Sequence, residues 1–405
     1  LGLPIEYKVV KESAGIAPAE IRRRSEAYAR QFIDVQRRQF KRLGVFGDWE
    51  HPYLTLDPAY EAEILRAFGH FVEKGLVYQS LKPVLWSTGA QTALAEAEVE
   101  YQEKTSPSIF VAFPIVSGVW AGEADLVIWT TTPWTLPANL AIAVHPRHRY
   151  VRARVHGDRF SGQIVVAREL LESVAAKCGF SEWRIEAEVS GAELAGTRAQ
   201  HPFLDRTATV YPAEFVTLDT GSGCVHIAPG HGEDDYHLGR TQGLPLLSPV
   251  DDNGRFTEAS GLPELVGQYV FDANGWIIDL LAARGRLLGR EEYQHSYPHC
   301  WRSKTPVIFR AVEQFFIRVE ALRERALQEI DQVRWIPAWG RNRIFGTVES
   351  RPDWCISRQR AWGVPVPAFY TPDGTPILDP ALIRRVADRV ASEGTNFWFE
   401  LTDAE

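Results

Sequence analysis

The chain has 405 residues, of which 45% are hydrophobic and 24% charged, and its formal net charge is −8. This length predicts two or three domains with a large core, and the composition is typical of a globular protein. The negative charge argues against a general nucleic-acid binder, so a polyanionic partner would have to meet a local basic patch.

Nothing in the sequence indicates a membrane or secreted protein. No run of about 18 apolar residues occurs, and the opening LGLPIEYKVV lacks the layout of a signal peptide. The four cysteines lie far apart, with no CxxC pair that would hold zinc: Cys178, Cys224, Cys300 and Cys355. Scattered thiols of this kind fit the cytosol, so we expect a cytoplasmic protein. Because the chain contains no Met, we interpret it as a piece of a longer chain.

Helical periodicity dominates the start of the chain. Between residues 17 and 43 apolar side chains recur at helical spacing among many arginines, and Gly44 follows as a stop signal. Asp57 and Pro58 then provide an N-cap and a first helical residue for a second helix, which we expect to end at Gly75.

From residue 108 the sequence changes to short β-rich runs separated by Gly, Pro and Asp turns. The runs are IFVAFPIV, DLVIWTTT, YVRARV, QIVVAR and TVYPAEFV. Brief helices are expected at residues 167–177, 234–242 and 272–284. We therefore predict a helical connecting segment (1–107), a β-dominated domain (108–290) and a return segment of mixed structure, rich in Arg and Trp (291–405).

The stretch WTTTPWTLPAN, residues 129–139, places three threonines in a row before Pro133. Thr suits a pleated surface because its Cβ is branched, so one interpretation is a strand that runs into a turn at Pro133. The hydroxyls can also serve a polar ligand, and the residues alone leave both interpretations open.

A second stretch, GSGCVHIAPGHGEDD at residues 221–235, contains a β-like run that breaks at Ala-Pro-Gly. A helix is expected to begin in its acidic end, where carboxylates are favoured by the helix dipole, so capping is one role for them. Asp234 and Asp235, with nearby histidines, invite a zinc hypothesis, but their spacing does not match HExxH. We expect no metal and histidines that complete local hydrogen bonds. The histidines are His226, His231 and His237.

Motifs for several other chemistries do not occur. No serine lies in GxSxG, and neither GxxxxGK[ST] nor a GxGxxG after a strand is present, which excludes ATP binding by those loops. The polar residues that remain are hydroxyls, an amide, histidines and a carboxylate. Such a set suits amine-bearing and ribose-like ligands and the positioning of water.

A third stretch, residues 333–367, holds six arginines, four tryptophans and only two acidic residues. Arginine forks with interleaved aromatic faces suit phosphates and unstacked bases. The alternative is a set of surface arginines packed on core tryptophans.

Four stretches, in this order and spacing, closely resemble bacterial isoleucyl-tRNA synthetases: WTTTPWTLPAN, GSGCVHIAPGHGEDDY, HSYPHCWRSKTPVIFRA and DWCISRQRAWGVPVP. The opening LGLPIE resembles the HGLPIE of that family, with Leu1 where His is usual. Valyl and leucyl relatives typically read TTRPET or TTRPDT where this chain has Thr132-Pro133-Trp134-Thr135. The resemblance covers essentially all 405 residues.

The resemblance implies a class I synthetase, in which a large editing insertion, CP1, splits a Rossmann-type catalytic domain. The expected fold class is mixed α/β: a β-rich editing domain, a distorted barrel with short helices, flanked by helical and mixed segments of the split domain. HIGH-type and KMSKS-type ATP motifs and the anticodon-binding region are expected outside this chain. No cofactor is expected within it, whereas the whole enzyme would use ATP and Mg to join isoleucine to tRNA(Ile).

The resemblance also implies an editing reaction, the hydrolysis of mischarged valyl-tRNA(Ile), with valine as the edited amino acid. Asp235 would bind the α-ammonium group of valine. Thr130, Thr131 and Thr132 would orient the terminal adenosine and the attacking water. No dedicated general base is expected, because the ester is already activated and a vicinal ribose hydroxyl can help to deliver water.

The remaining residues carried over by resemblance would bind substrate. Trp134 and His226 would form a wall that admits valine and refuses isoleucine. Asn139 would add an amide contact, and His231 would bind substrate or shape its loop.

Arg358 and Arg360, in the sequence SRQR, resemble positions that guide the 3′ end of tRNA. The expected partner is the acceptor end of tRNA(Ile), and we expect a monomer. Three alternatives stay open: a non-catalytic fragment that binds the acceptor end, an editing domain of a valyl or leucyl relative, and a metal-dependent hydrolase.

Overall fold

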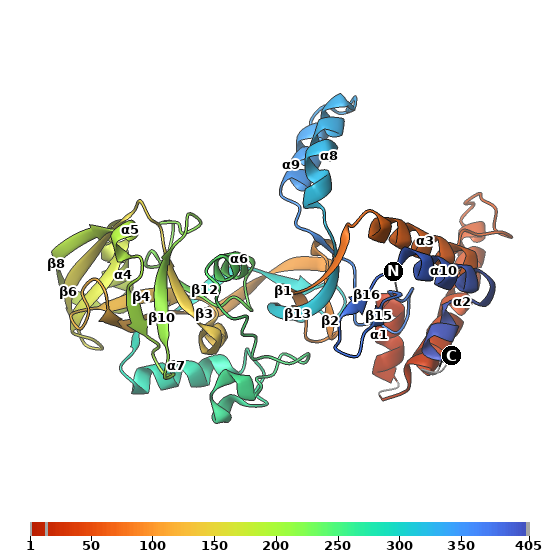
Figure 1. Ribbon diagram of the computed structural model, residues 1–405. Coiled ribbons are helices and arrows are strands. Elements are labelled where there is room, and N and C mark those ends of the chain that lie inside the picture. Colours follow the sequence, from red (N-terminus) through yellow and green to blue (C-terminus); the bar gives the residue numbers. More distant parts are fainter. Residues whose placement is uncertain (1, 13–14, 402–405) are drawn as a thin grey trace. The chain divides into compact units, whose positions relative to one another are not determined.

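The computed structural model describes residues 2–12 and 15–401, so Leu1 lies outside the described residues. Contacts divide the chain into two compact units. The first comprises Leu1–Leu81 and Glu313–Glu405, and the second comprises Lys82–Val312 (Figure 1). No helix among the described residues is both long and apolar enough to cross a membrane.

The first unit is mainly helical. Its helices are α1 (Leu3–Glu12), α2 (Pro18–Arg42), α3 (Pro58–Glu73), α8 (Glu320–Gln332), α9 (Gly340–Glu349), α10 (Pro380–Glu393) and the 3-10 helix η6 (Thr395–Phe399). Its short strands are β14 (Trp354–Cys355), β15 (Phe369–Tyr370) and β16 (Pro376–Ile377). Two further strands, β1 (Val77–Ser87) and β13 (Val307–Ile317), run through the unit boundaries.

The second unit is mainly β-structure. Its strands are β2 (Thr92–Ala93), β3 (Val99–Ser117), β4 (Asp125–Thr130), β5 (Ala141–Val144), β6 (Arg149–Gly157), β7 (Gly162–Ala167), β8 (Phe180–Ser190), β9 (Arg198–Gln200), β10 (Thr207–Pro212), β11 (Cys224–Ile227) and β12 (Leu287–Cys300). Its helices are α4 (Leu171–Cys178), α5 (Gly191–Leu194), α6 (Glu233–Thr241) and α7 (Ala273–Ala283). The 3-10 helices are η1 (Glu96–Glu98), η2 (Pro133–Ala138), η3 (Arg168–Leu170), η4 (Glu258–Ser260) and η5 (Pro263–Leu265).

The main sheet of the second unit has ten strands in the order β11-β5-β10-β9-β3-β4-β7-β6-β8, with β12 paired to β3. The first strand of this order, β11, also contacts β4, so the sheet curves back on itself as a half-barrel. The expected mixed α/β class, with a β-rich domain carrying short helices, is confirmed. The largest fully buried side chains of the second unit include Phe110, Phe113, Leu126, Ile128, Leu136, Ile142 and Tyr150.

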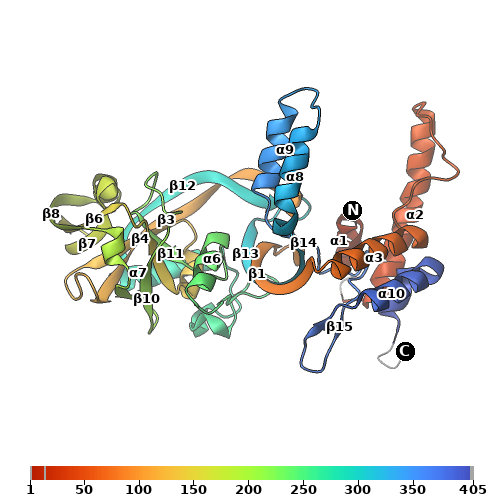
Figure 2. The ribbon, with the colours of Figure 1, turned by 45° about the horizontal axis from the view of Figure 1, so that its top comes forward.

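Strands β3 and β12 extend this unit beyond the predicted β-dominated domain. They pair antiparallel from Val111 opposite Leu287 to Val99 opposite Cys300, and Figure 2 shows them side by side as a long ribbon. The predicted domain, residues 108–290, therefore lies inside the second unit, which continues in both directions. The paired residues are 176 apart in the sequence at one end of the ribbon and 201 apart at the other, a separation that local patterns do not reveal. Between these ends, His295 and Ser106, 189 residues apart, share a hydrogen bond.

Most predicted helices are confirmed within one or two residues. Helix α2 begins at Pro18 and ends at Arg42, and α3 begins at Pro58 after Asp57. Gly75 follows α3 with a φ of 68°, a left-handed conformation that favours glycine. The helical part of the first predicted segment ends there, because β1 and β3 occupy much of residues 77–107.

The β-rich run TVYPAEFV is only partly a strand. Strand β10 covers its first residues and ends at Pro212. Proline has no N–H with which to continue the ladder, so the chain turns there. Val216 instead packs in a small core with Ala141 and Ile227.

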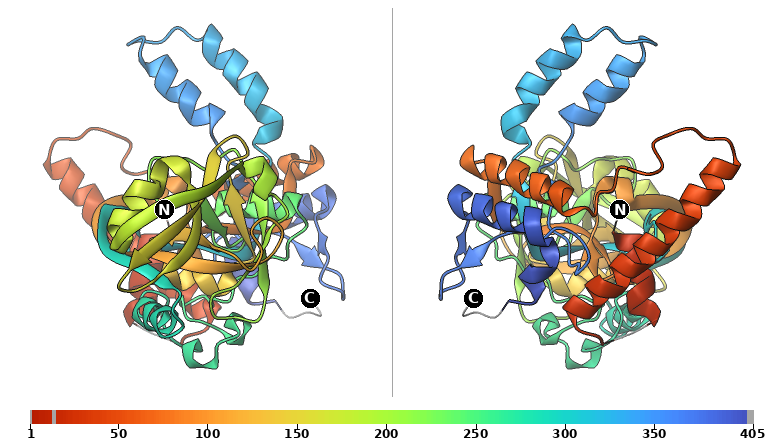
Figure 3. Two further views of the ribbon diagram at one scale, coloured as in Figure 1. Left: turned by 90° about the vertical axis from the view of Figure 1, so that its left-hand side faces the viewer. Right: turned by 90° about the vertical axis from the view of Figure 1, so that its right-hand side faces the viewer.

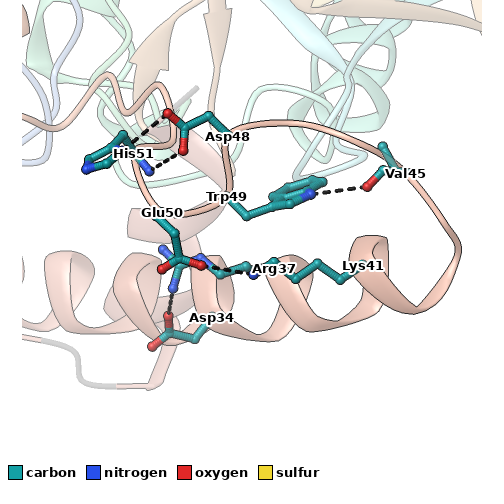
Figure 4. Close-up of polar contacts among 8 residues, drawn as sticks. All are labelled: Asp34, Arg37, Lys41, Val45, Asp48, Trp49, Glu50 and His51. Carbon is teal, nitrogen blue, oxygen red and sulfur yellow. Dashed lines mark hydrogen bonds and ion pairs between the residues drawn. The ribbon is translucent and has the colours of Figure 1, made fainter.

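Residues 30–57, the second half of α2 and the loop that follows, are here called the α2 arm. Figure 3 shows this helix and loop, and also the antiparallel helices α8 and α9. Polar contacts between neighbours hold the arm: Lys41 Nζ lies 3.0 Å from Glu50 Oε1, and Trp49 Nε1 donates to the carbonyl oxygen of Val45 at 3.1 Å (Figure 4). The Phe40 and Trp49 rings stack with centroids 5.8 Å apart.

Candidate active site

The threonine run lies where a strand of the half-barrel ends. Strand β4 stops at Thr130 and η2 begins at Pro133, so the predicted strand and turn are confirmed. The Thr132 backbone N–H donates to Thr130 Oγ1 at 3.0 Å, and the Thr130 and Thr132 hydroxyl oxygens lie 3.2 Å apart. Thr131 is half-buried. The turn thus holds Thr130 and Thr132 in one hydrogen-bonded group.

Thr135, which the sequence did not single out as a site residue, joins this group to His226. Its hydroxyl donates to the Thr132 carbonyl oxygen at 2.9 Å and lies 3.0 Å from His226 Nε2. Because the hydroxyl hydrogen is used on the carbonyl, the contact with His226 requires an N–H at Nε2. The signal that could have revealed Thr135 was present, since it is a hydroxyl within the same motif.

His226 is positioned by the pairing of β11 with β5, where it lies opposite Ile142. Its Nδ1 is 3.5 Å from Asn139 Nδ2, and the same amide nitrogen donates to the Ala141 carbonyl oxygen at 2.9 Å. With the hydrogen on Nε2, Nδ1 is free to accept from Asn139. Burial, aided by the nearby His231, lowers the pKa of His226 to about 4, so the ring is neutral at pH 7.

Asp235 lies in the first turn of α6, as the acidic pattern predicted. Its Oδ2 accepts a hydrogen bond from the Ala228 backbone N–H at 2.8 Å, and Ala228 directly follows β11. Burial raises the pKa of Asp235 to about 6, while the Ala228 N–H opposes this shift. Asp234 is exposed. The carboxylate is therefore attached to the same strand end that carries His226.

Trp134 and the half-buried His231 form an aromatic contact beside this group. Trp134 is only 3% exposed, and its ring meets the His231 ring edge to face, with centroids 5.0 Å apart. The Trp134 backbone N–H donates to Asn274 Oδ1 at 3.0 Å, a support for which the sequence offered no signal. His231 Nδ1 lies 2.9 Å from the Phe309 carbonyl oxygen, and burial lowers its pKa to about 4.

The structure thus links the predicted residues through short contacts within the second unit. The group contains hydroxyls, an amide, two neutral imidazoles and a buried indole, and a carboxylate lies on the adjoining turn. Within the part of the chain that is described, no group of three His, Cys, Asp or Glu side chains could hold a metal ion. His237 is exposed, 4.0 Å from Glu233.

Arg358 and Arg360 belong to the first unit and contact their own chain. Arg358 Nη1 donates to the carbonyl oxygens of Cys355 and Ser357 at 2.9 Å and 2.8 Å. Arg360 Nη1 lies 3.9 Å from Glu6 Oε1.

The tryptophans near these arginines are not core residues as a group. Trp339 is 64% exposed and Trp354 is 48% exposed. The alternative of surface arginines packed on core tryptophans is therefore wrong for these two positions.

Comparison with known proteins identifies the class. The family model for class I tRNA synthetases (I, L, M and V) matches residues 1–405, and the chain belongs to this family.

Within the family, the chain is similar to isoleucine–tRNA ligases. It is 52% identical over 413 residues to the isoleucine–tRNA ligase of Methylacidiphilum infernorum (isolate V4), covering 100% of this chain and 45% of that protein. It is 50% identical over 404 residues to that of Geobacillus kaustophilus (strain HTA426), covering 98% of this chain and 43% of that protein. The chain therefore spans less than half the length of these curated relatives.

Among solved structures, the P. knowlesi cytosolic leucyl-tRNA synthetase editing domain matches with a TM-score of 0.37 and 9% identity, covering 47% of this chain and 97% of that one. GlLeuRS-CP1 matches with a TM-score of 0.36 and 16% identity, covering 47% of this chain and 100% of that one.

Proposed function

We propose that this chain carries the editing activity of an isoleucyl-tRNA synthetase and hydrolyses valyl-tRNA(Ile). The observation that carries the proposal is the chain of contacts from Thr130 through the half-buried Thr132 and the buried Thr135 to the buried His226. It joins hydroxyls that suit a ribose and a water molecule to a neutral ring that can face an apolar side chain. The similarity to isoleucine–tRNA ligases over the whole chain supports the choice of amino acids.

The need for such a site follows from the size of one methylene. A hydrophobic pocket gains only about 1–3 kcal/mol from it, and separation of isoleucine from valine by this class of enzyme is the known example of that limit. A second site that excludes isoleucine by size and destroys the valyl ester corrects the error.

In the proposed reaction, Asp235 binds the α-ammonium group of the valyl ester. A hydrogen bond that involves a charged group contributes about 1.5–3 kcal/mol, so this contact would dominate binding of the amino-acid portion. Trp134 and His226 form the wall that measures the side chain. His226 suits this role because its pKa of about 4 leaves it uncharged at pH 7.

The hydroxyls orient the reaction rather than provide a strong base. Thr130, Thr131 and Thr132 hold the terminal ribose and a water molecule, with Asn139 supporting His226 from its other side. The ester is already activated, and the vicinal ribose hydroxyl helps to deliver the water, so positioning accounts for the rate. Neither imidazole is required to take a proton.

The proposal extends to the whole protein. The longer enzyme would join isoleucine to tRNA(Ile) with ATP and Mg, and this chain would need no cofactor for hydrolysis. Its partner would be the 3′ acceptor end of tRNA(Ile), guided by Arg358 and Arg360, and it would act as a monomer in the cytoplasm.

The test is a deacylation assay of the 405-residue chain with valyl-tRNA(Ile), with and without a chelator. Hydrolysis that is insensitive to the chelator and lost in Asp235→Ala is expected, with Asp234→Ala as the matched control. Binding without hydrolysis would favour a non-catalytic acceptor-end fragment instead. Sensitivity to the chelator would favour a metal-dependent hydrolase, and preferential hydrolysis of another aminoacyl-tRNA would favour a valyl or leucyl relative.

A further inference from the structure

Three buried polar atoms around the candidate site have no hydrogen-bond partner among residues 2–12 and 15–401: Trp134 Nε1, Asn139 Oδ1 and His231 Nε2. Folded proteins satisfy nearly all such atoms with protein, water or ligand partners, so these three atoms are positions where a water molecule or a ligand group can bind. Of the three, His231 Nε2 has the most sharply defined chemistry, because the other side of its ring is already engaged.

The His231 ring is held in one tautomer. Nδ1 lies 2.9 Å from the Phe309 carbonyl oxygen, and since a carbonyl oxygen can only accept, Nδ1 carries the hydrogen. Burial lowers the pKa of His231 to about 4, which leaves the ring neutral at pH 7. Nε2 therefore presents a lone pair and can only accept a hydrogen bond.

His231 and Asp235 lie on one short turn. The His231 backbone N–H donates to the Ala228 carbonyl oxygen at 2.8 Å, and the Ala228 N–H donates to Asp235 Oδ2 at 2.8 Å. Gly232 leaves room for the carboxyl group, because a Cβ there would lie 3.0 Å from Asp235 Cγ. The turn therefore carries two acceptors, and the His231 ring also contacts the Trp134 wall.

We infer that His231 Nε2 accepts a hydrogen bond from the α-ammonium group of the aminoacyl ester, as a second acceptor beside the Asp235 carboxylate. The inference rests on the proposed function and deepens it. An ammonium group has three N–H donors and no lone pair, so two acceptors on one turn match it. The pair makes the site selective for α-amino acyl esters over esters whose α-substituent offers fewer donors.

Two substitutions at His231 separate this role from a structural one. His231→Asn keeps an N–H that can face the Phe309 carbonyl oxygen but lacks an acceptor at the Nε2 position. His231→Gln places an amide oxygen near the Nε2 position. The probes are adenosine linked to valine through an amide, which cannot be hydrolysed, and the same compound without the α-ammonium group.

Calorimetric titration of the 405-residue chain with each probe measures the two binding affinities. His231→Asn should bind the valyl probe roughly 10- to 100-fold more weakly than the parent, while binding of the desamino probe stays unchanged. His231→Gln should recover valyl binding to within about fivefold. If His231→Asn binds the valyl probe as tightly as the parent, or weakens both probes equally, the inference is overturned.

A measurement on the parent chain tests the inference without any substitution, so it does not depend on whether the variants fold. In nitrogen-15 NMR of the imidazoles, the His231 Nε2 resonance should move toward lower frequency with the valyl probe and stay in place with the desamino probe. No movement with a bound valyl probe overturns the inference alone. A parent chain that binds neither probe and does not hydrolyse valyl-tRNA(Ile) overturns the proposed function, and the inference with it.

Discussion

In the α2 arm Phe46 is 98% exposed, whereas Trp134 in the half-barrel is 3% exposed. The arm is held by contacts between neighbours in sequence, such as Lys41 with Glu50 at 3.0 Å. The candidate site is held by contacts over long separations, such as Thr135 with His226, 91 residues apart.

The difference matters for chemistry. Burial moves the pKa of His226 down and that of Asp235 up, and it leaves polar atoms such as His231 Nε2 without solvent to satisfy them. Water screens the ion pairs of the arm, so charged side chains there interact only weakly with one another. A site that binds and orients a small polar group therefore needs the buried sheet, and the following predictions test that contrast.

The largest difference in stability is expected between two Phe→Ala substitutions, one in the buried sheet and one in the α2 arm. Phe110→Ala, in a residue 1% exposed in the sheet, should lower the free energy of unfolding by about 3–5 kcal/mol, because a cavity remains. Phe46→Ala should change it by less than about 0.5 kcal/mol. Denaturant unfolding followed by circular dichroism measures both, and equal losses would remove the contrast.

Asp235→Asn should lower the deacylation rate by about 100-fold, because the ammonium group loses its anion. The same change should stabilise the fold at pH 7. Burial raises the folded pKa to about 6, above that of the unfolded chain, so the stability that Asp235 contributes is present below about pH 4 and is lost as the pH rises through 6. Asn stays neutral, so the variant should gain up to about 3 kcal/mol at pH 7.

Melting temperatures of the parent and of Asp235→Asn between pH 4 and pH 8 provide the check. The two curves should lie close together at pH 4, separate progressively between pH 4 and pH 6 and stay a constant distance apart above pH 6, while Asp234→Asn, at an exposed position, should follow the parent. Curves that keep the same distance from pH 4 to pH 8 would mean that the carboxylate is well solvated.

Thr135→Val keeps the shape of the side chain but removes the hydroxyl between Thr132 and His226. Deacylation should fall by about tenfold, since His226 loses the contact that fixes its tautomer, and stability should fall by about 1–2 kcal/mol. Thr241→Val, whose exposed hydroxyl donates to the His237 carbonyl oxygen, is the matched control. A rate unchanged in Thr135→Val would show that the tautomer has no role.

Arg358→Ala tests a position intermediate in burial between the α2 arm and the candidate site. Arg358 is half-buried and donates a hydrogen bond to the carbonyl oxygen of Cys355. If this side chain also meets a phosphate, tRNA binding should weaken about threefold, and the slope of log K against log salt should decrease by about 1. Arg325→Ala, at an exposed position of α8, is the control. Unchanged slopes for both variants would assign Arg358 a purely structural role.

The smallest effect is expected from Glu50→Gln in the α2 arm. The exposed pair with Lys41 should contribute little to the free energy of unfolding, and less at high salt. Thermal unfolding at low and high salt measures this. A fall in melting temperature as large as that of Thr135→Val would indicate that the arm is stabilised in the same way as the buried sheet.

Local patterns predicted local structure well. The Pro58 start of α3, the end of β4 at Thr130 and the strand from Cys224 to Ile227 all follow from spacing, turn residues and β-branched runs. These features depend on residues within one turn or one strand of each other. The motif spellings also pointed to the family to which the chain belongs.

The tertiary structure decided which of those residues lie together. Register between β11 and β5 brings His226 to Asn139, and the β3 and β12 ribbon sets the extent of the second unit. The acceptor role of His231 depends on the Phe309 carbonyl oxygen, 78 residues away. A sequence pattern records residue types, whereas tautomers, pKa values and unpaired atoms depend on burial and on distant partners, which only the folded chain supplies.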